Sequence, residues 1–224
     1  MTTASPTIDF ETLSAGAVRE EVGPRDHGWS FVASKHVVDV VLAIGLLILF
    51  APFIVVAALA IELTSPGPAF YVQWRVGRHG RLFRMFKLRS MVVDAEVGSG
   101  PVWCTERDPR ITPVGRLLRA THLDELPQLI NVIKGEMSLV GPRPERPVFV
   151  KRLSREVPNY MARLEVRPGI TGLAQVCHGY DQTIEDVKRK LAYDLVYIRR
   201  MCWMVDARIL LATVKKAVPQ PGLA

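Results

Sequence analysis

Residues 121–129 read THLDELPQL, and residues 135–144 read GEMSLVGPRP. The first stretch places two adjacent carboxylates, Asp124 and Glu125, before an apolar pattern, and the second places Arg143 between two prolines. A carboxylate can act as a nucleophile or as a metal ligand, and a guanidinium on a rigid loop suits a phosphate group. The segment therefore indicates chemistry on a phosphate, carried by a helix and by the loop that follows it.

The residues after Asp124 have the spacing of an amphipathic helix. The apolar positions of this pattern are Leu126, Leu129, Ile130 and Ile133. Asp is a favoured N-cap, Pro127 is tolerated in a first turn, and Gly135 is typical of a helix end. We expect Asp124 at the helix N-terminus, where amide donors and the helix dipole favour an ionised carboxylate, and Glu125 in the exposed first turn. An Asp cap followed by Glu is also ordinary helix capping, so the pair alone does not establish a site.

Three further cations are candidate phosphate ligands. Lys87 and Arg89 lie in the stretch FKLRSM at 86–91, and Arg167 precedes a Pro-Gly turn. The alternative for Lys87 and Arg89 is the solvated face of a basic hairpin, because residues 69–76 and 81–88 are two short mixed segments separated by Gly77-Arg78-His79-Gly80.

Residues 40–61 form an uncharged run of 22 residues, which as a helix would reach roughly 33 Å, enough to cross a bilayer. Pro52 near its middle predicts a kink. Two topologies remain open: a spanning helix, and a re-entrant helix whose two ends return to the cytosol. Basic residues on both flanks favour the second topology weakly.

The chain has 224 residues and a formal net charge of +7. Its first 34 residues carry two basic and five acidic side chains, so the remainder carries +10. The polar, aperiodic residues 1–34 predict a disordered acidic tail, and residues 35–224 predict one domain that includes a membrane helix at 37–61. A basic body suits nucleic acid, an anionic membrane or a phosphorylated substrate, and the apolar run decides in favour of the membrane.

The remaining periodic segments predict helices. Helical patterns cover 113–120, 147–164 with an interruption near Pro158, and one or two amphipathic helices over 184–216. These patterns predict an α+β, mostly helical fold: a membrane helix of open topology and a small domain with a short β-hairpin and amphipathic helices.

Six ordered motifs together resemble the bacterial sugar transferase family, the small monotopic phosphoglycosyl transferases. They lie at 86–91 (FKLRSM), 108–112 (DPRIT), 123–129 (LDELPQL), 131–132 (NV), 135–144 (GEMSLVGPRP) and 166–176 (VRPGITGLAQV). The resemblance runs from about residue 35 to about residue 213. It implies a re-entrant membrane helix broken at a proline, plus a small cytoplasmic domain with a short β-hairpin and membrane-associated amphipathic helices. One departure is Ala51-Pro52, where family members often have Ser-Pro at the break of the membrane helix.

The resemblance implies transfer of a sugar-1-phosphate from a nucleotide diphosphate sugar, expected to be a UDP-sugar, to polyprenyl (undecaprenyl) phosphate. Asp124 would be the covalent nucleophile and Glu125 a Mg²⁺ ligand beside it, with Lys87 and Arg143 binding phosphate. The reaction would begin exopolysaccharide, capsule, O-antigen or glycoprotein glycan synthesis on the cytoplasmic face of the bacterial inner membrane. Membrane lipid would be a partner, and a homodimer is compatible with the family.

Two other function classes compete. A membrane-anchored scaffold without catalysis would hold other glycan enzymes, and it predicts that Asp124 can be changed freely. A nucleic-acid binder is disfavoured, because the chain has an apolar membrane run and no motif that reads bases.

Overall fold

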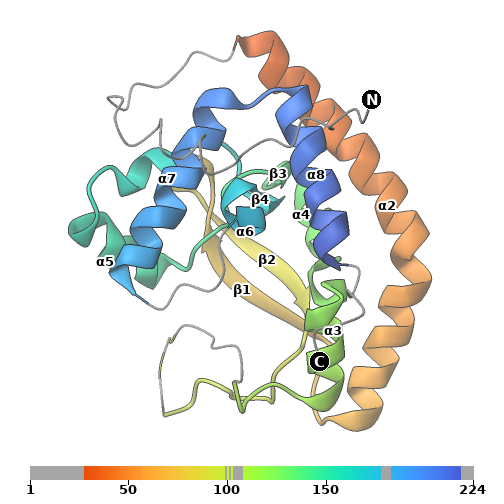
Figure 1. The fold of residues 1–224 in the computed structure, drawn as a ribbon. Helices are drawn as coiled ribbons and strands as arrows, with labels where there is room; N and C mark the ends of the chain where they lie inside the picture. The colour runs from red at the N-terminus through yellow and green to blue at the C-terminus, as the bar shows by residue number, and fades with distance from the viewer. Residues whose placement is uncertain (1–27, 99, 101, 103–107, 178–182, 218–224) are drawn as a thin grey trace, which may run out of the picture.

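The computed structural model describes residues 28–98, 100, 102, 108–177 and 183–217. This part of the chain is mostly helical with two small sheets, which confirms the predicted α+β class (Figure 1). The helices are α2 (Trp29–Thr64), α3 (Pro113–Ala120), α4 (Gln128–Ile133), α5 (Pro147–Glu156), α6 (Leu173–Cys177), α7 (Ile184–Arg200) and α8 (Trp203–Ala217). The strands are β1 (Phe70–Val76), β2 (Leu82–Leu88), β3 (Ser138–Val140) and β4 (Gly169–Thr171). The 3₁₀ turns are η1 (Arg78–Gly80), η2 (Leu123–Glu125) and η3 (Tyr160–Leu164).

Helix α2 is longer than the membrane helix predicted at 37–61. Its 36 residues begin at Trp29, inside the predicted tail, and end at Thr64. The rest of that tail, residues 1–27, lies outside the described residues. The helix continues through Pro52, and Figure 1 shows it curving around one side of the protein. A proline inside a helix removes one backbone hydrogen bond and clashes with the preceding turn, so it is a physical cause of such curvature.

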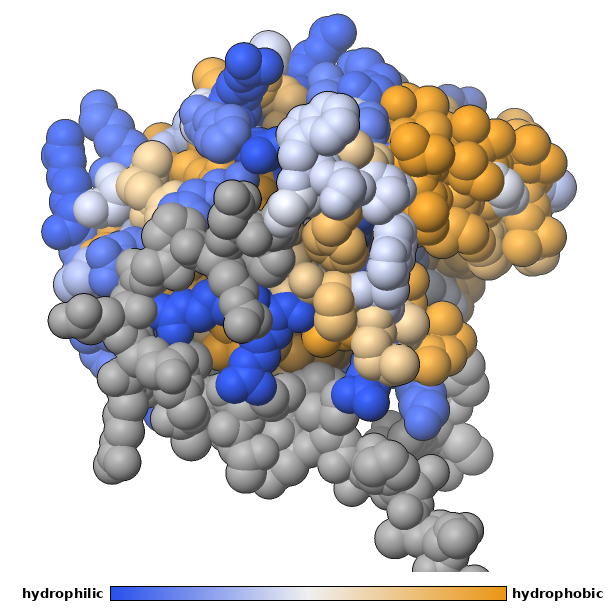
Figure 2. All heavy atoms as spheres, turned by 90° about the horizontal axis from the view of Figure 1, so that it is seen from above, coloured by the Kyte–Doolittle hydropathy of each residue, from blue (hydrophilic) through white to orange (hydrophobic). Residues whose placement is uncertain are grey.

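Most of α2 is not covered by the rest of the chain. Only 11% of its most apolar 18-residue window is buried, although the helix is long and apolar enough to cross a membrane. The exposed apolar side chains include Val37, Val41, Ile48, Leu49, Phe53 and Val56. In Figure 2 apolar surface gathers on the right, the side on which α2 lies in Figure 1. A continuous apolar surface of this kind is typical of a membrane contact.

Both halves of α2 nevertheless pack on the same small body. In the N-terminal half, Lys35 Nζ lies 2.7 Å from Asp206 Oδ2 of α8. In the C-terminal half, Ala57 and Ile61 are buried in a cluster that includes Leu88 and Leu118. Between these ends, Ala43 is fully buried in the main apolar cluster, so one face of the curved helix stays against the body.

The predicted hairpin is confirmed. Strands β1 and β2 pair antiparallel, with Tyr71 opposite Lys87. Their connection includes His79 at φ 56°, in the left-handed region that a tight turn requires. Side chains two residues apart share a face of a strand, so Lys87 lies on the face of β2 that carries the buried Phe83 and Met85. The hairpin thus aims Lys87 toward the body of the protein.

Strands β3 and β4 form a parallel pair that the sequence patterns did not predict. The pair joins the loops of the GPRP and RPGITG motifs: Gly141 N donates to Thr171 O at 2.9 Å, and Gly169 N donates to Pro142 O at 2.9 Å. A Cβ added at Gly169 would lie 2.1 Å from Gly141 N, so this approach of two backbones requires glycine.

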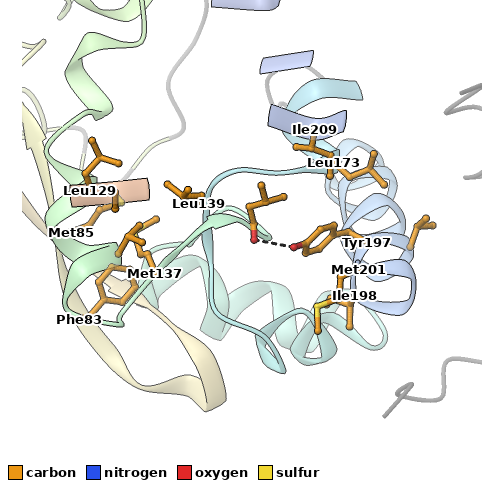
Figure 3. Packing of buried hydrophobic residues seen from close by; sticks show 14 residues of the cluster. Phe83, Met85, Leu129, Met137, Leu139, Leu173, Tyr197, Ile198, Met201 and Ile209 are labelled. Atoms are coloured by element: carbon orange, nitrogen blue, oxygen red, sulfur yellow. Dashed lines mark hydrogen bonds between the residues drawn. The ribbon is translucent and has the colours of Figure 1, made fainter. Parts of the chain in front are cut away.

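The largest buried apolar cluster lies among α4, β3, α7 and α8 (Figure 3). Figure 3 shows Tyr197 pointing at the end of β3, where its hydroxyl donates to the Val140 carbonyl oxygen at 3.0 Å. This contact joins α7 to the strand that leads directly into the Gly141–Pro144 loop. The core therefore fixes the starting point of the loop that carries Arg143.

The other helices follow the predicted patterns closely. Helix α3 spans the predicted 113–120, and Thr112 caps it by accepting from Gly115 N at 2.9 Å. The segment 147–164 is divided into α5 and η3 near Pro158, and the segment 184–216 is divided into α7 and α8. A capping box of Thr183 and Asp186 begins α7.

Candidate active site

The two carboxylates of the LDELPQL motif do not begin a helix, which corrects the sequence prediction. Asp124 and Glu125 lie in the 3₁₀ turn η2, and α4 begins only at Gln128. His122, at φ 56°, turns the chain sharply before η2, and Pro127 has no N–H with which to continue a helix from the turn. Asp124 is therefore no N-cap, and its side chain is buried with 5% of the residue exposed. The predicted end of α4 is confirmed, because Gly135 follows it at φ 75°.

Glu125 is also not the exposed first-turn residue that the pattern predicted. Its side chain is 13% exposed and is held between two cations. Lys87 Nζ lies 2.7 Å from Glu125 Oε1, and Arg143 Nη1 donates to Glu125 Oε2 at 3.1 Å. Arg143 Nη2 also donates to Glu125 Oε1, which makes the guanidinium contact bidentate. The fold thus gathers Lys87 from β2, Glu125 from η2 and Arg143 from the loop after β3.

This ion cluster sets the charge of its members. Burial opposes ionisation of Glu125, but Arg143 and Lys87 outweigh it and hold the pKa of Glu125 well below its ordinary value. The Glu125 carboxylate raises the pKa of Arg143. Burial lowers the pKa of Lys87, although Glu125 opposes this effect. Glu125 is therefore ionised at neutral pH and keeps two cations beside Asp124.

The Asp124 carboxylate differs from the Glu125 carboxylate in its hydrogen bonds and ion pairs. Within the described part of the chain, no hydrogen bond or ion pair involves the Asp124 carboxylate. Burial raises its pKa, and Glu125 adds to this effect, while Lys87, Arg119 and Arg143 oppose it. A carboxylate that lies among three cations, without being bonded to any of them, is available to react with or bind a further group.

Asn131 positions this cluster, a role that the sequence patterns did not reveal. Its Nδ2 donates to Arg84 O of β2 at 2.7 Å and to Glu136 Oε2 at 2.7 Å, and its Oδ1 accepts from Phe86 N at 3.1 Å. Asn131 is fully buried on α4. Its bonds to the backbone of β2 join α4 to the strand that carries Lys87. The signal in the sequence was a polar residue inside an apolar helix pattern.

Arg163 likewise positions Arg143 without contacting Glu125. Its Nη2 donates to the backbone carbonyl oxygen of Arg143 at 2.9 Å and to Asp194 Oδ2 at 2.7 Å. The side chains of Arg163 and Asp194 are each only 2% exposed. The Tyr160 hydroxyl accepts from Arg163 Nη1 at 3.0 Å. No spacing in the sequence connects η3, α7 and the GPRP loop, so this network could not be predicted.

The loop is fixed on its other side by Glu145. Lys190 Nζ lies 2.7 Å from Glu145 Oε1, and Arg75 Nη1 lies 3.7 Å from Glu145 Oε2. Burial would raise the pKa of Glu145, but Lys190, Arg163 and Arg75 lower it to about 2. Val76 N donates to Glu145 O at 2.9 Å, so β1 also holds the loop.

Two predicted phosphate ligands lie elsewhere. Arg89 is buried, and its guanidinium donates to the carbonyl oxygens of Ser65, Pro66 and Gly67, just after α2. This arrangement favours a structural role for Arg89 over the predicted phosphate contact. Arg167 donates from Nε to Gly135 O at 3.0 Å and lines a different cavity from the cluster around Asp124.

The side chains at this site that could bind a metal ion are the carboxylates of Asp124 and Glu125. No group of three or more His, Cys, Asp or Glu side chains that could hold a metal ion is found among the described residues. Mg²⁺ commonly binds through one or two protein carboxylates together with substrate phosphates and water. Asp124, with Glu125 next to it, fits this kind of site and does not fit a site built from protein ligands alone.

Comparison with known proteins identifies the class to which this fold and site belong. The profile of the family described as "Bacterial sugar transferase" matches residues 30–220. The chain therefore belongs to the bacterial sugar transferase family, as the six motifs predicted.

Curated relatives are similar over most of this chain. A UDP-glucose:undecaprenyl-phosphate glucose-1-phosphate transferase of Caulobacter vibrioides is 47% identical over 182 residues, covering 80% of this chain and 68% of the relative. A UDP-N-acetylgalactosamine-undecaprenyl-phosphate N-acetylgalactosaminephosphotransferase of Aeromonas hydrophila is 42% identical over 181 residues, covering 81% of this chain and 43% of the relative. An exopolysaccharide production protein, PSS, of Rhizobium leguminosarum bv. phaseoli is 38% identical over 188 residues and is covered to 92%. The chain thus spans 43% of the length of the Aeromonas protein, 68% of the Caulobacter protein and 92% of the Rhizobium protein.

Proposed function

We propose that this protein transfers a sugar-1-phosphate from a UDP-sugar to undecaprenyl phosphate, and so begins the synthesis of a surface polysaccharide. The observation that carries the proposal is the contrast between the two carboxylates. Glu125 is bonded to Lys87 and Arg143, whereas Asp124 has no bond to any described residue and lies among the same cations. The names of the relatives support the substrate classes, a UDP-sugar and undecaprenyl phosphate.

In the first step, an oxygen of the Asp124 carboxylate attacks the phosphorus that bears the sugar. The bond from this phosphorus to the bridging oxygen breaks, and the nucleoside monophosphate leaves with that oxygen. The sugar phosphate is then an acyl phosphate on Asp124. In the second step, a phosphate oxygen of the polyprenyl phosphate attacks the same phosphorus and releases Asp124 as a free carboxylate.

Lys87 and Arg143 offset negative charge on the phosphates in both steps. Glu125 holds these two side chains at the site, since each is bonded to it. Asp124 and Glu125 would hold Mg²⁺, which when bound would supply further positive charge to the phosphate oxygens.

We further propose that α2 is re-entrant, with the body of the protein on the cytoplasmic face of the inner membrane. The support is that the two halves of α2 pack on one body, through Lys35 and Asp206 at one end and through Ile61 and Leu118 at the other. A helix that crossed the membrane would place its two ends on opposite sides, where a single compact body could not contact both.

The test of the reaction is Asp124→Asn, incubated with a panel of UDP-sugars and followed by intact-protein mass spectrometry. We expect a sugar-phosphate adduct on the wild-type protein and none on the variant, because an amide is a poor nucleophile. Release of nucleoside monophosphate should disappear as well. Because Asp124 has no bonded partner in the described part of the chain, the variant should keep the thermal midpoint of the wild type. An adduct that persists on the Asn variant contradicts the role of Asp124, and wild-type protein that neither forms an adduct nor releases nucleotide supports a scaffold instead.

A further inference from the structure

A second cavity lies away from Asp124. It has a volume of about 190 Å³ and lies between the N-terminal part of α2, the turn η1, the end of η3 and α7. The charged side chains that line it are Lys35, Asp39, Arg78, Glu165 and Arg167. None of them belongs to the cluster of Lys87, Glu125 and Arg143.

Lys35 and Asp39 are bonded within the protein. Lys35 Nζ lies 3.3 Å from Asp39 Oδ2 and 2.7 Å from Asp206 Oδ2. Asp39 Oδ2 also accepts from the Ser138 hydroxyl at 2.5 Å. Both side chains therefore have hydrogen-bond partners, and the guanidiniums of Arg78 and Arg167 are the other cations of the cavity.

Arg78 and Arg167 are anchored through one nitrogen each. Arg78 Nε donates to the backbone carbonyl oxygen of Glu165 at 2.9 Å, and Arg167 Nε donates to Gly135 O at 3.0 Å. Within the described residues, no carboxylate pairs with either guanidinium, so the terminal nitrogens of both remain as donors. Glu165 is an exposed residue, and its carboxylate forms no ion pair with described residues. The two arginines thus bring two positive charges to one cavity, and the carboxylates of Asp39 and Glu165, which also line it, are not bonded to them.

The charge of Arg78 acts on Arg167. Burial lowers the pKa of Arg167, and the charge of Arg78 lowers it further, while Asp39 opposes this effect. An anion between the two side chains would relieve this repulsion. Forked guanidinium donors match the oxygens of a phosphate, and anchoring through Nε reduces the entropy that binding would cost.

The surroundings of the cavity indicate where the anion comes from. Its apolar lining includes Val32 and Val166, and the exposed apolar side chains of α2 include Val37, two residues beyond Lys35. Figure 2 shows that this apolar surface lies next to polar surface of the body. The cavity is therefore placed where a membrane surface would meet the protein.

We propose that Arg78 and Arg167 bind a phosphate ester in this cavity, namely the headgroup of an anionic membrane lipid. The site is separate from the proposed reaction centre, because Arg78 lies at the turn of the hairpin and Lys87 near the other end of β2. At about 3.3 Å per residue, Leu82 and Lys87 alone are roughly 17 Å apart along the strand. The lipid would hold the N-terminal end of α2 and the RPGITG loop at the membrane surface.

Native mass spectrometry of the detergent-solubilised protein, titrated with dihexanoylphosphatidylglycerol, tests the proposal. We expect Arg78→Gln combined with Arg167→Gln to weaken binding at least tenfold. Arg78→Gln alone should weaken it severalfold, and a thermal midpoint equal to that of the wild type would show that this variant is folded. Arg152→Gln is the matched control, since Arg152 is an exposed arginine paired with Glu156. Equal binding by the double variant and the control would overturn the site.

Two further probes separate the sources of the phosphate. Dihexanoylglycerol has the same chains without phosphate, and it should bind at least tenfold more weakly than the phospholipid. If it binds equally well, the contact is apolar and the proposal is wrong. Inorganic phosphate should displace the phospholipid only at concentrations at least tenfold above those of the lipid. Displacement at equal concentration would overturn the lipid assignment in favour of a soluble phosphate. None of these measurements depends on catalysis at Asp124.

Discussion

Arg163 donates a hydrogen bond of 2.9 Å to the backbone carbonyl oxygen of Arg143. Through this bond, a buried ion pair between η3 and α7 determines the position of a side chain in the loop after β3. Arg143 therefore depends on residues that form no hydrogen bond with Glu125 or Lys87.

Replacing Arg163 with Gln should destabilise the protein and misplace Arg143. The change leaves Asp194 as a buried charge without its partner, which costs about 3–5 kcal/mol when a buried pair is broken. For a protein of this size, the thermal midpoint should fall by roughly 6–20 °C. Thermal unfolding in detergent measures this, and Arg152→Gln on the exposed surface of α5 should leave the midpoint unchanged. If Arg163→Gln melts with the wild type, the buried pair does not support the loop.

Glu125→Gln should reduce stability as well as activity. The sequence pattern placed Glu125 in an exposed first turn, where such a change would leave folding intact. In the structure, Glu125 is the counter-ion of Lys87 and Arg143, so the amide leaves two partly buried cations without their acceptor. Thermal unfolding should show a drop of several degrees. Glu185→Gln, which removes the exposed pair with Lys188, is the control and should have no such effect.

Glu145 should make stability dependent on pH in the acid range. Its pKa is about 2 in the folded protein and about 4.5 when unfolded, so the unfolded chain binds more protons between these values. The stabilisation from Glu145 is fully present above about pH 4.5 and is lost as the pH falls toward 2. It amounts to about 3 kcal/mol in order of magnitude. Unfolding of Glu145→Gln measured against pH should have a shallower slope in this window than the wild type, and identical slopes would contradict the shift.

Both ends of α2 should face the cytoplasm. Cysteines introduced at Ser30, near the start of α2, and at Ser154, on α5, can be probed in whole cells with an impermeant thiol reagent after the native cysteines are replaced. Neither should be labelled until the cells are permeabilised. Labelling of the Ser30 position alone from outside would show that the helix spans the membrane.

Pro52→Leu should shift α2 toward the spanning form. The substitution restores the backbone hydrogen bond that proline removes, and it allows a straight ladder of 36 residues. The same labelling experiment should then detect the Ser30 cysteine from outside in part of the population. Because position 51 is Ala, no hydroxyl is available there to bond a freed carbonyl, so the bend should be sensitive to this change. A Pro52→Leu variant labelled like its parent would show that the contacts of Lys35 and Ile61, and not the proline, impose the curve.

The sequence by itself determined the elements whose signals are local. The hairpin, α3, the division of 147–164 near Pro158 and the end of α4 at Gly135 follow from turn residues, caps and apolar periodicity. The family and its candidate residues Asp124, Glu125, Lys87 and Arg143 follow from ordered motifs. The predicted start of α4 was wrong. The capping rule places an Asp at a helix start, whereas His122 and Pro127 impose a separate turn.

The tertiary structure alone decided which charges meet. It joined Lys87 and Arg143 on Glu125 and left Asp124 without a bonded partner among the described residues. It also placed Arg89 against the end of α2 and paired Lys35 with Asp206 across 171 positions of the sequence. Periodicity describes one element at a time, and each of these contacts joins elements far apart in the chain. The physical reason is that a buried charge must find its partner wherever packing brings one, and packing is a property of the whole fold.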